Sequence, residues 1–216
     1  MRYCMENWRK QEDKSETMGD ITFFNRWDTK DVVVQDKGLV KYLTINPRFM
    51  PKTGARYAGN RFHKSYTSIV ERLAVKIMGS GHKSKKHFMS SGHNTGKKNK
   101  ALAVVESALA KAEVKMKMNP VAILVRAVEN AAPREEVIAI EYGGARYPKA
   151  VDVAPQRRID LALRYMTQGA YAKSFNKKQK IEDALCDEVV FAAQCSGRSN
   201  AVAKKRDLER QAASSK

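Results

Sequence analysis

The chain has 216 residues, of which 43% are hydrophobic, so it is long enough to bury the core of one ordinary domain. Its 41 Lys and Arg residues outnumber 23 Asp and Glu residues, and the resulting net charge of +18 exceeds what solubility requires. No uninterrupted apolar run approaches the ~18 residues of a membrane span, and the start, MRYCMENWRKQEDK, lacks the apolar core of a signal peptide. We therefore expect an intracellular protein with a polyanionic partner, for which nucleic acid and an anionic membrane surface are both candidates.

The cysteines are three, Cys4, Cys186 and Cys195, an odd number with no CxxC pair. This pattern indicates neither a disulfide framework nor a cysteine zinc site. Cys186 and Cys195 lie within a helical pattern, where we expect both to be small buried hydrophobes.

The N-terminal part of the chain has few helical signals. Residues 1–20 carry charges of both signs without an apolar period, which predicts a mobile extension. The apolar runs at 21–27 and 32–34 predict short extended segments laid on the body of the protein. A loop-rich passage follows at 46–64, with no acid between Lys37 and Arg61. We expect this passage to follow a phosphate backbone through Arg48, Lys52, Arg56, Arg61 and Lys64.

The first helix is predicted to begin at Ser65 and to end at Gly79. An apolar residue recurs every four positions, which places Ile69, Leu73 and Ile77 on the core side. The polar residues of the same stretch are expected on the outer face, namely Glu71, Arg72 and Lys76.

The segment 81–100, GHKSKKHFMSSGHNTGKKNK, has no acid and is the strongest loop signal in the chain. His82, His87 and His93 lack a fourth nearby ligand, which argues against zinc. A phosphate-binding P-loop would need Gly at position 91 and Ser or Thr at position 98, where the chain has Ser91 and Lys98.

We favour a basic loop that becomes ordered on nucleic acid, with a solvated surface loop as the alternative reading. Lysine charges and loop amides are the groups that meet phosphates in such a loop. The lysines concerned are Lys83, Lys85, Lys86, Lys97, Lys98 and Lys100.

Two helices are predicted next, at 101–118 and 119–133. In the first, the apolar period places a core stripe at Leu102, Val105, Leu109, Ala112 and Met116. In the second, Asn119 is the expected N-cap and Pro120 the first helical residue. Because the connection is short, we expect the two helices to be antiparallel neighbours that support the base of the next element.

That next element is a projecting β-hairpin at about 137–153. Gly143 and Gly144 separate two runs rich in Val, Ile, Ala and Tyr, as a two-residue turn with positive φ angles requires. Pro148 suits an isolated ribbon better than the middle of a large sheet. After the ribbon, Pro155 predicts a helix start, and Arg157 and Arg158 stand in its first turn, where cations oppose the helix dipole. We interpret the two arginines as a contact for a polyanion.

The C-terminal part alternates helices with basic segments. The helix after the hairpin is predicted to end near Gly169, and a basic segment at 173–180 contains Lys177 and Lys178. A further helix carries the stripe Ile181, Leu185, Val189 and Ala192, and Gly197 ends it. The last stretch, with Lys204, Lys205 and Arg206, is expected to be a short basic helix that frays into a tail. The fold class is therefore mainly α, a helical bundle with one protruding hairpin and basic loops and tails.

Four segments resemble the small-subunit ribosomal protein family called S-seven in bacteria, a universal protein of the subunit head. They are NTGKK at 94–98, NPVAILVRAVENAAPREE at 119–136, YGGARYPKAVDVAPQRR at 142–158 and AVAKKRDLER at 201–210. The resemblance runs from about residue 21 to 216, as one RNA-binding domain, and the ITFFNRW start is similar to the archaeal and eukaryotic cytosolic branch. Residues 1–20 have no counterpart in it.

The resemblance implies a structural, non-enzymatic protein of the cytoplasmic ribosome. It implies binding to the 3′ major domain of small-subunit rRNA, nucleation of head assembly, contacts with neighbouring head proteins, and a place near exit-site tRNA and the mRNA exit path. The basic loop at 83–100 and the arginines Arg157 and Arg158 are the implied rRNA contacts. The implied tRNA-proximal hairpin residues are Gly143, Gly144, Arg146, Tyr147 and Lys149. The tip, EYGGARYP, includes Glu141 and few cations, so its tyrosines are expected to pack or stack.

Two other classes of function are weaker. A free-standing nucleic-acid chaperone or DNA-compacting protein would have a similar composition but would sediment apart from the small subunit. For an enzyme, the sequence offers no convincing nucleophile and base pair and no complete metal set, and no cofactor is expected. The adjacent Glu135 and Glu136 are expected to begin the hairpin.

Overall fold

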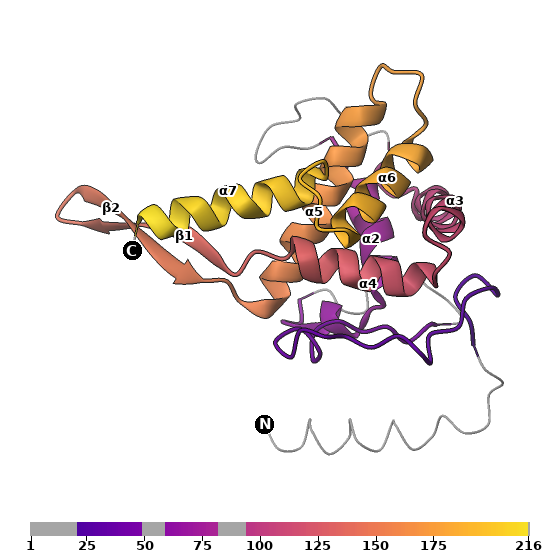
Figure 1. Ribbon diagram of the computed structural model, residues 1–216. Coiled ribbons are helices and arrows are strands. Elements are labelled where there is room, and N and C mark those ends of the chain that lie inside the picture. Colours follow the sequence, from indigo (N-terminus) through magenta and orange to yellow (C-terminus); the bar gives the residue numbers. More distant parts are fainter. Residues whose placement is uncertain (1–20, 49–58, 82–93, 216) are drawn as a thin grey trace, which may run out of the picture.

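The computed structural model describes residues 21–48, 59–81 and 94–215 and is mainly α-helical with one two-stranded antiparallel hairpin, which confirms the predicted fold class (Figure 1). After a short 3-10 helix, η1 (His63–Tyr66), the elements follow in the order α2 (Ile69–Met78), α3 (Lys98–Met116), α4 (Pro120–Ala131), β1 (Glu135–Tyr142), β2 (Ala145–Asp152), α5 (Pro155–Ser174), α6 (Ile181–Ala193) and α7 (Asn200–Ser214).

Helix α6 lies at the centre of the bundle, in contact with α3, α4, α5 and α7. Its apolar residues are almost all buried, including the predicted Leu185, Val189 and Ala192. Cys186 is buried as expected, but Cys195 is exposed just beyond the helix with a φ of 54°. The prediction for Cys195 is therefore wrong, because α6 ends at Ala193 and the chain turns before the cysteine.

Helix α2 buries side chains on more than one of its faces. Ile69, Leu73 and Ile77 face the core as predicted, whereas Glu71 and Arg72, expected on the outer face, are 2% and 6% exposed. The reason is that α2 is covered on two sides, by α3 and by α5. Both buried charges have partners from those two helices, as described below.

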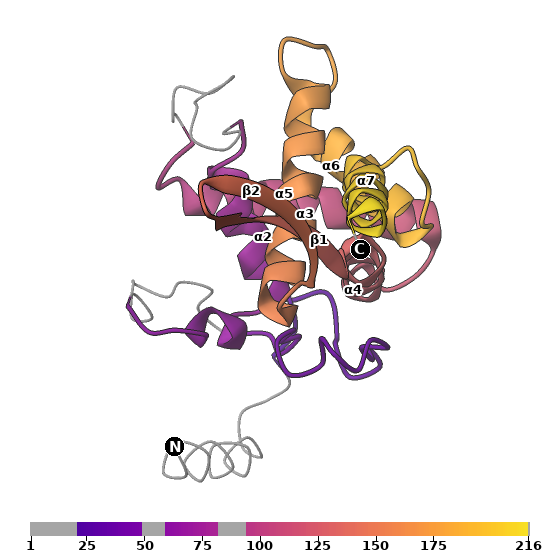
Figure 2. The same cartoon turned by 90° about the vertical axis from the view of Figure 1, so that its left-hand side faces the viewer.

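Helices α3 and α4 cross steeply and do not form the antiparallel pair that the short connection suggested. Figure 1 shows α3 end-on while α4 lies across the view, and Figure 2 shows the reverse. Lys117 adopts a left-handed φ of 53° that turns the chain, and the Asn119 side chain then accepts a hydrogen bond from the Val121 amide at 3.0 Å, as the predicted N-cap. At the base of the hairpin the supporting helix is α7, which contacts both strands.

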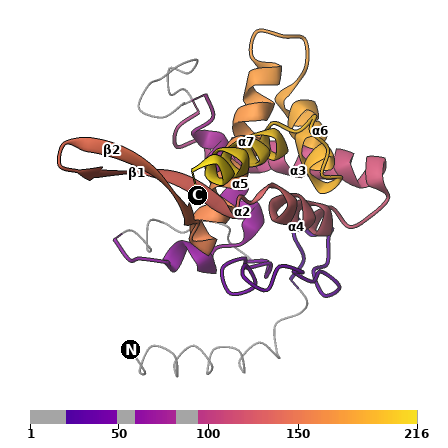
Figure 3. The same cartoon turned by 60° about the vertical axis from the view of Figure 1, so that its left-hand side comes forward.

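The hairpin matches its prediction in turn and register. Tyr142 pairs with Ala145 across Gly143 and Gly144, whose φ angles are 58° and 80°, and the ladder continues to Glu135 and Asp152. The ribbon projects away from the bundle (Figure 3). Because it has only two strands, Pro148 occupies a strand with an open edge.

Helix α5 continues past Gly169, where the sequence predicted its end, to Ser174. A Cβ added at Gly169 would lie 2.7 Å from the Cβ of Asn200 and 2.8 Å from Oε1 of Glu188. This glycine therefore serves the close approach of α6 and α7 rather than a helix end.

Helix α7 is not the frayed tail that the sequence suggested. It has 15 residues, and Ala201, Val202 and Ala212 are buried at its two ends. It contacts α5 and the hairpin, and these contacts along its length keep a weakly apolar sequence helical (Figure 3).

The segment before α2 is largely irregular. Within the predicted strand at 21–27, a single bridge joins Phe23 and Trp27, and both side chains are buried. Trp27 donates its indole N–H to Glu113 of α3 at 2.9 Å. The segment thus lies on the body as predicted, but it is held by side chains more than by strand pairing. None of the helices in the described ranges is long and apolar enough to cross a bilayer.

Candidate nucleic-acid interface

The structure divides the predicted RNA-contacting cations into paired and free groups. Arg56, Lys83, Lys85 and Lys86 lie outside the described residues, as do the three loop histidines. The remaining candidates are placed below according to whether the chain itself already supplies their partner.

Lys98 is paired within the protein, whereas the described part of the chain shows no ion pair for Lys97 or Lys100. Its ammonium forms an ion pair with the buried carboxylate of Glu71, and the Lys98 side chain is 17% exposed. Lys97 and Lys100 are exposed at the start of α3. The two exposed lysines are therefore available to phosphates, while Lys98 joins α3 to α2.

The two arginines at the start of α5 also have internal partners. Arg157 donates two hydrogen bonds to Glu136 of β1, at 2.7 and 2.8 Å, and these bonds raise the pKa of its guanidinium. Arg158 donates to Asp36 at 2.8 Å and to the Pro133 carbonyl at 3.2 Å. The Glu136 and Asp36 carboxylates thus offset the unfavourable position of the two cations at a helix N-terminus, and the contact of Arg157 and Arg158 with rRNA stays a prediction.

Two of the three predicted RNA-contacting cations of α7, Lys205 and Arg206, donate to carbonyls at or just beyond the ends of other helices. Lys205 donates to the Asn130 carbonyl near the end of α4 at 2.9 Å, and burial lowers its pKa. Arg206 donates to the Cys195 carbonyl at 3.1 Å, just after α6. Cations at helix C-termini satisfy carbonyls that have no partner within the helix. Lys204 remains exposed, as do Lys177 and Lys178 in the loop between α5 and α6.

A cationic cluster that the sequence did not single out surrounds Asp160 of α5. Lys64 forms an ion pair with it, Arg72 lies 3.2 Å away and Lys76 lies 4.0 Å away. Burial raises the pKa of Asp160, but the Lys64 hydrogen bond and the charges of Lys76 and Arg72 lower it more. Burial also lowers the pKa of Lys76, and the nearby charge of Arg164 adds to this.

The Asp160 carboxylate faces three cations, Lys64, Arg72 and Lys76, so the surface between α2 and α5 keeps positive charge after internal pairing. The sequence signal for it was the four-residue spacing of Asp160 and Arg164 on one face of a helix. That signal is weak because Lys64 and Lys76 come from a different part of the chain.

A hollow of about 690 Å³ continues this basic surface between α5 and the start of α7. Glu188 is fully buried at its floor, 2.6 Å from the ammonium of Lys173. The cations that line the hollow are Arg164, Lys173, Arg198 and Lys204. Since only one of the four is paired with Glu188, the hollow is electropositive.

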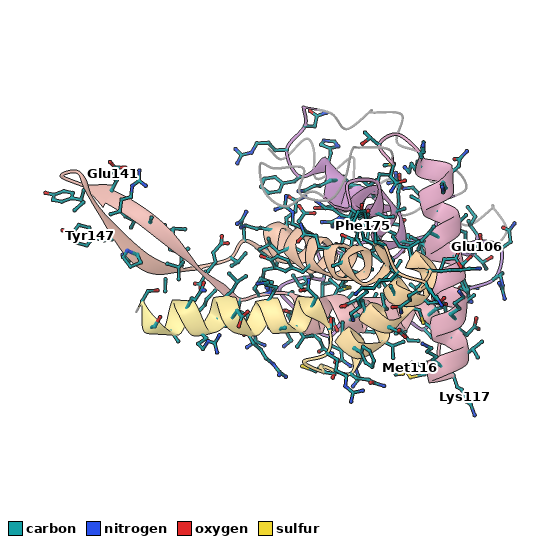
Figure 4. All side chains as sticks on the ribbon, turned by 90° about the horizontal axis from the view of Figure 1, so that it is seen from above. Glu106, Met116, Lys117, Glu141, Tyr147 and Phe175 are labelled. Atoms are coloured by element: carbon teal, nitrogen blue, oxygen red, sulfur yellow. The ribbon has the colours of Figure 1, made fainter. Side chains whose placement is uncertain are left out.

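The hairpin candidates occupy the exposed tip of the ribbon. Gly143 and Gly144 form the turn, and Arg146 lies 3.7 Å from Glu141 across the strands. Figure 4 shows Glu141 and Tyr147 at the far end of the hairpin. Lys149 is exposed on β2.

The described surface suits anion binding rather than catalysis. No cluster of three or more metal-ligating side chains is found among the described residues. The exposed lysines, the Asp160 cluster and the hollow all present positive charge, and positive surface of this kind binds phosphates without sequence specificity.

Comparison with known proteins identifies the family to which this chain belongs. The family model described as Ribosomal protein S7p/S5e matches residues 40–216. The "Small ribosomal subunit protein uS7" of Nanoarchaeum equitans is 47% identical over 91% of this chain and 99% of its own length. The proteins of the same name from Methanosphaera stadtmanae and Methanothermobacter thermautotrophicus are 45% and 43% identical, over 88% and 87% of this chain and 96% and 95% of their own lengths. The chain therefore belongs to the Ribosomal protein S7p/S5e family, as a structural, rRNA-binding and non-enzymatic protein of the small ribosomal subunit.

Proposed function

We propose that this protein binds the 3′ major domain of small-subunit rRNA, nucleates assembly of the subunit head and works in the cytoplasm. The hairpin lies near exit-site tRNA and the mRNA exit path, and the body contacts neighbouring head proteins. Family membership supports the subunit, and the resemblance of the four sequence segments supports the finer placement.

The observation that carries the rRNA contact is a set of exposed cations for which the described residues provide no ion-pair partner. They are exposed at the start of α3, in the loop between α5 and α6 and on α7, namely Lys97, Lys100, Lys177, Lys178 and Lys204. The predicted contacts Arg56, Lys83, Lys85 and Lys86 extend this set on the basic loops. Arg157 remains a candidate because its side chain is 56% exposed although it is paired.

Replacing Lys97 and Lys100 together by Ala tests the contact at the start of α3. Each lost phosphate contact removes ~0.9 from the slope of log affinity against log salt for a duplex-like site, so the double variant should lose about 1.8. The measurement is filter binding to a transcript of the 3′ major domain over a series of salt concentrations.

Lys117→Ala is the matched control, because Lys117 is exposed at the opposite end of α3 (Figure 4). Its slope should stay at the wild-type value. An unchanged slope for the double variant would remove the start of α3 from the rRNA interface. Sedimentation of the tagged chain apart from the small subunit would favour a free-standing chaperone instead.

A further inference from the structure

The turn before α2 carries an exposed aromatic ring on an unfavourable backbone conformation. Phe62 has a φ of 65°, in the left-handed region, and the residue is 55% exposed. Left-handed φ angles are rare for bulky residues, whereas asparagine and glycine adopt them at lower cost. A side chain that stays half in solvent also gains little from the hydrophobic effect. The stability of the fold therefore does not account for a phenylalanine at this position.

The turn is fixed by hydrogen bonds from other parts of the chain. The Ser65 carbonyl accepts a hydrogen bond from the Thr44 hydroxyl at 2.6 Å, and the Ser65 hydroxyl accepts one from Gln156 of α5 at 3.0 Å. The Arg48 guanidinium donates to the carbonyl of the next residue, Tyr66, at 2.6 Å. Backbone strain persists where the surroundings fix it, and such strain is typical of functional positions.

Cations lie on both sides of the Phe62 ring in the sequence. The guanidinium carbon of Arg61 lies over the ring, 5.6 Å from its centroid. Lys64 is 53% exposed although it pairs with Asp160, and Asp160 also faces two cations of α2. The turn thus combines an exposed ring with positive charge, as proteins that bind single-stranded nucleic acid do.

We infer that Phe62 is a stacking site for one unpaired base of small-subunit rRNA, with Arg61 and Lys64 near the phosphates of that nucleotide. Every base has a flat face that stacks on an aromatic ring, but only a base in a loop, a bulge or an end exposes that face. The inference rests on the proposed binding to the 3′ major domain. It deepens that proposal because it assigns an unpaired base, rather than a phosphate, to a named side chain.

An acidic surface of another protein is the alternative occupant, because it would also complement the cations. The exposed apolar side chains between residues 59 and 66 are both aromatic, Phe62 at 55% and Tyr66 at 44%. The Tyr66 ring lies edge-on to His63, with centroids 5.5 Å apart. Protein interfaces instead bury contiguous apolar patches, so two rings among cations favour a nucleotide.

The test compares Phe62→Asn with Phe62→Tyr in filter binding of the full chain to a transcript of the 3′ major domain. Asparagine suits the left-handed φ but has no stacking face. Phe62→Asn should weaken binding about 5- to 150-fold, the range expected for loss of one stacked base. Phe62→Tyr keeps the stacking face and should bind within about twofold of the wild-type chain.

Two further readouts separate stacking from phosphate contact and from a structural role. The slope of log affinity against log salt should be the same for Phe62→Asn as for wild type, because no phosphate contact is lost. Its thermal midpoint should fall by less than about 2 °C, because asparagine adopts the left-handed φ at lower cost. Arg61→Ala, by contrast, should reduce the slope by ~0.7, the value for one phosphate of a single strand.

The stacking site is overturned if Phe62→Asn binds as tightly as Phe62→Tyr, if its salt slope falls, or if its thermal midpoint falls in step with affinity. An unchanged slope for Arg61→Ala overturns the phosphate contact of Arg61.

Photocrosslinking in intact small subunits identifies the occupant. The tagged chain carries p-azidophenylalanine in place of Phe62, or in place of Val114 as the matched control. Val114 of α3 is 78% exposed, and its neighbours Lys111 and Lys115 are paired with acids of α6. Reverse transcription should stop at one unpaired nucleotide for the Phe62 probe and not for the Val114 probe. An adduct with a protein, an adduct at a base-paired nucleotide, equal stops from both probes or no adduct overturns the inference.

Failure of the stacking site is distinguishable from failure of the proposed function. If the wild-type chain does not bind the transcript, the proposed function itself is overturned. If the wild-type chain binds and Phe62→Asn binds equally well, only the stacking site is overturned.

Discussion

Glu188 is an acidic side chain without exposed surface, and it joins three helices. Its carboxylate lies 2.6 Å from Lys173 of α5 and accepts hydrogen bonds from the Ser199 hydroxyl and the Asn200 amide, both at 2.9 Å. Glu188→Ala would leave a partly buried ammonium and the start of α7 without their anion. We expect a loss of about 3–5 kcal/mol in the free energy of unfolding, measured by urea denaturation.

Asp207→Ala is the control for Glu188→Ala, because Asp207 pairs with Arg210 on the surface of α7. Exposed pairs of this kind contribute about 0–1 kcal/mol. Similar losses for the two variants would contradict the structural role of Glu188.

Asp160 makes the stability of the folded protein depend on pH. Its pKa is lower in the folded protein than the ordinary 3.8, so the folded state binds fewer protons than the unfolded chain. The stabilisation is present above the unfolded pKa of about 3.9 and is lost as pH falls through the folded value. Asp160→Asn should therefore reduce the urea midpoint clearly at about pH 6 and much less at about pH 2–3. An equal reduction at both pH values would contradict the prediction.

At the scale of elements, the tip of the hairpin is expected to contribute little to the stability of the bundle. The described side chains from Ala139 to Tyr142 and from Ala145 to Pro148 are all exposed, so they contribute little to the core. Deleting both segments leaves Ile138 and Lys149, a directly opposed pair, joined by Gly143 and Gly144. We expect the thermal midpoint to change by less than about 2 °C, since surface changes are usually within about 0.5 kcal/mol.

A fall of more than about 5 °C in the shortened chain would show that the tip stabilises the bundle. Thermal denaturation followed by circular dichroism measures the midpoint. The control for the method is Gly169→Ala, where the added Cβ would overlap Asn200 and Glu188, and overpacking of this kind costs about 1–3 kcal/mol.

At the scale of the whole molecule, the charge of +18 opposes compactness. Added salt screens repulsion between exposed cations more than it weakens buried pairs such as Glu188 with Lys173. Raising the salt from about 50 mM to about 500 mM should therefore raise the thermal midpoint of the free protein while it weakens rRNA binding. A midpoint that falls with salt would mean that ion pairs, rather than repulsion, dominate.

The sequence correctly predicted those features whose geometry depends on neighbouring residues. The Asn119 cap, the Gly143 and Gly144 turn and the Pro155 start depend on φ angles and hydrogen bonds within a few residues, and all three were predicted correctly. The stripes of α2 and α6 were predicted because apolar burial follows the helical period. These signals determined the fold class by themselves.

Tertiary structure decided which charges are available to RNA. Lys98, Arg157, Arg158, Lys205 and Arg206 have the same sequence appearance as free cations, but each is bound by a carboxylate or carbonyl distant in the chain. Gly169 resembled a helix end because its packing partners come from α6 and α7. The sequence alone determined that the protein is basic and mainly helical and that it has one β-hairpin. Only the tertiary structure decided which cations remain unpaired, because a long-range ion pair leaves no periodic signal in the chain.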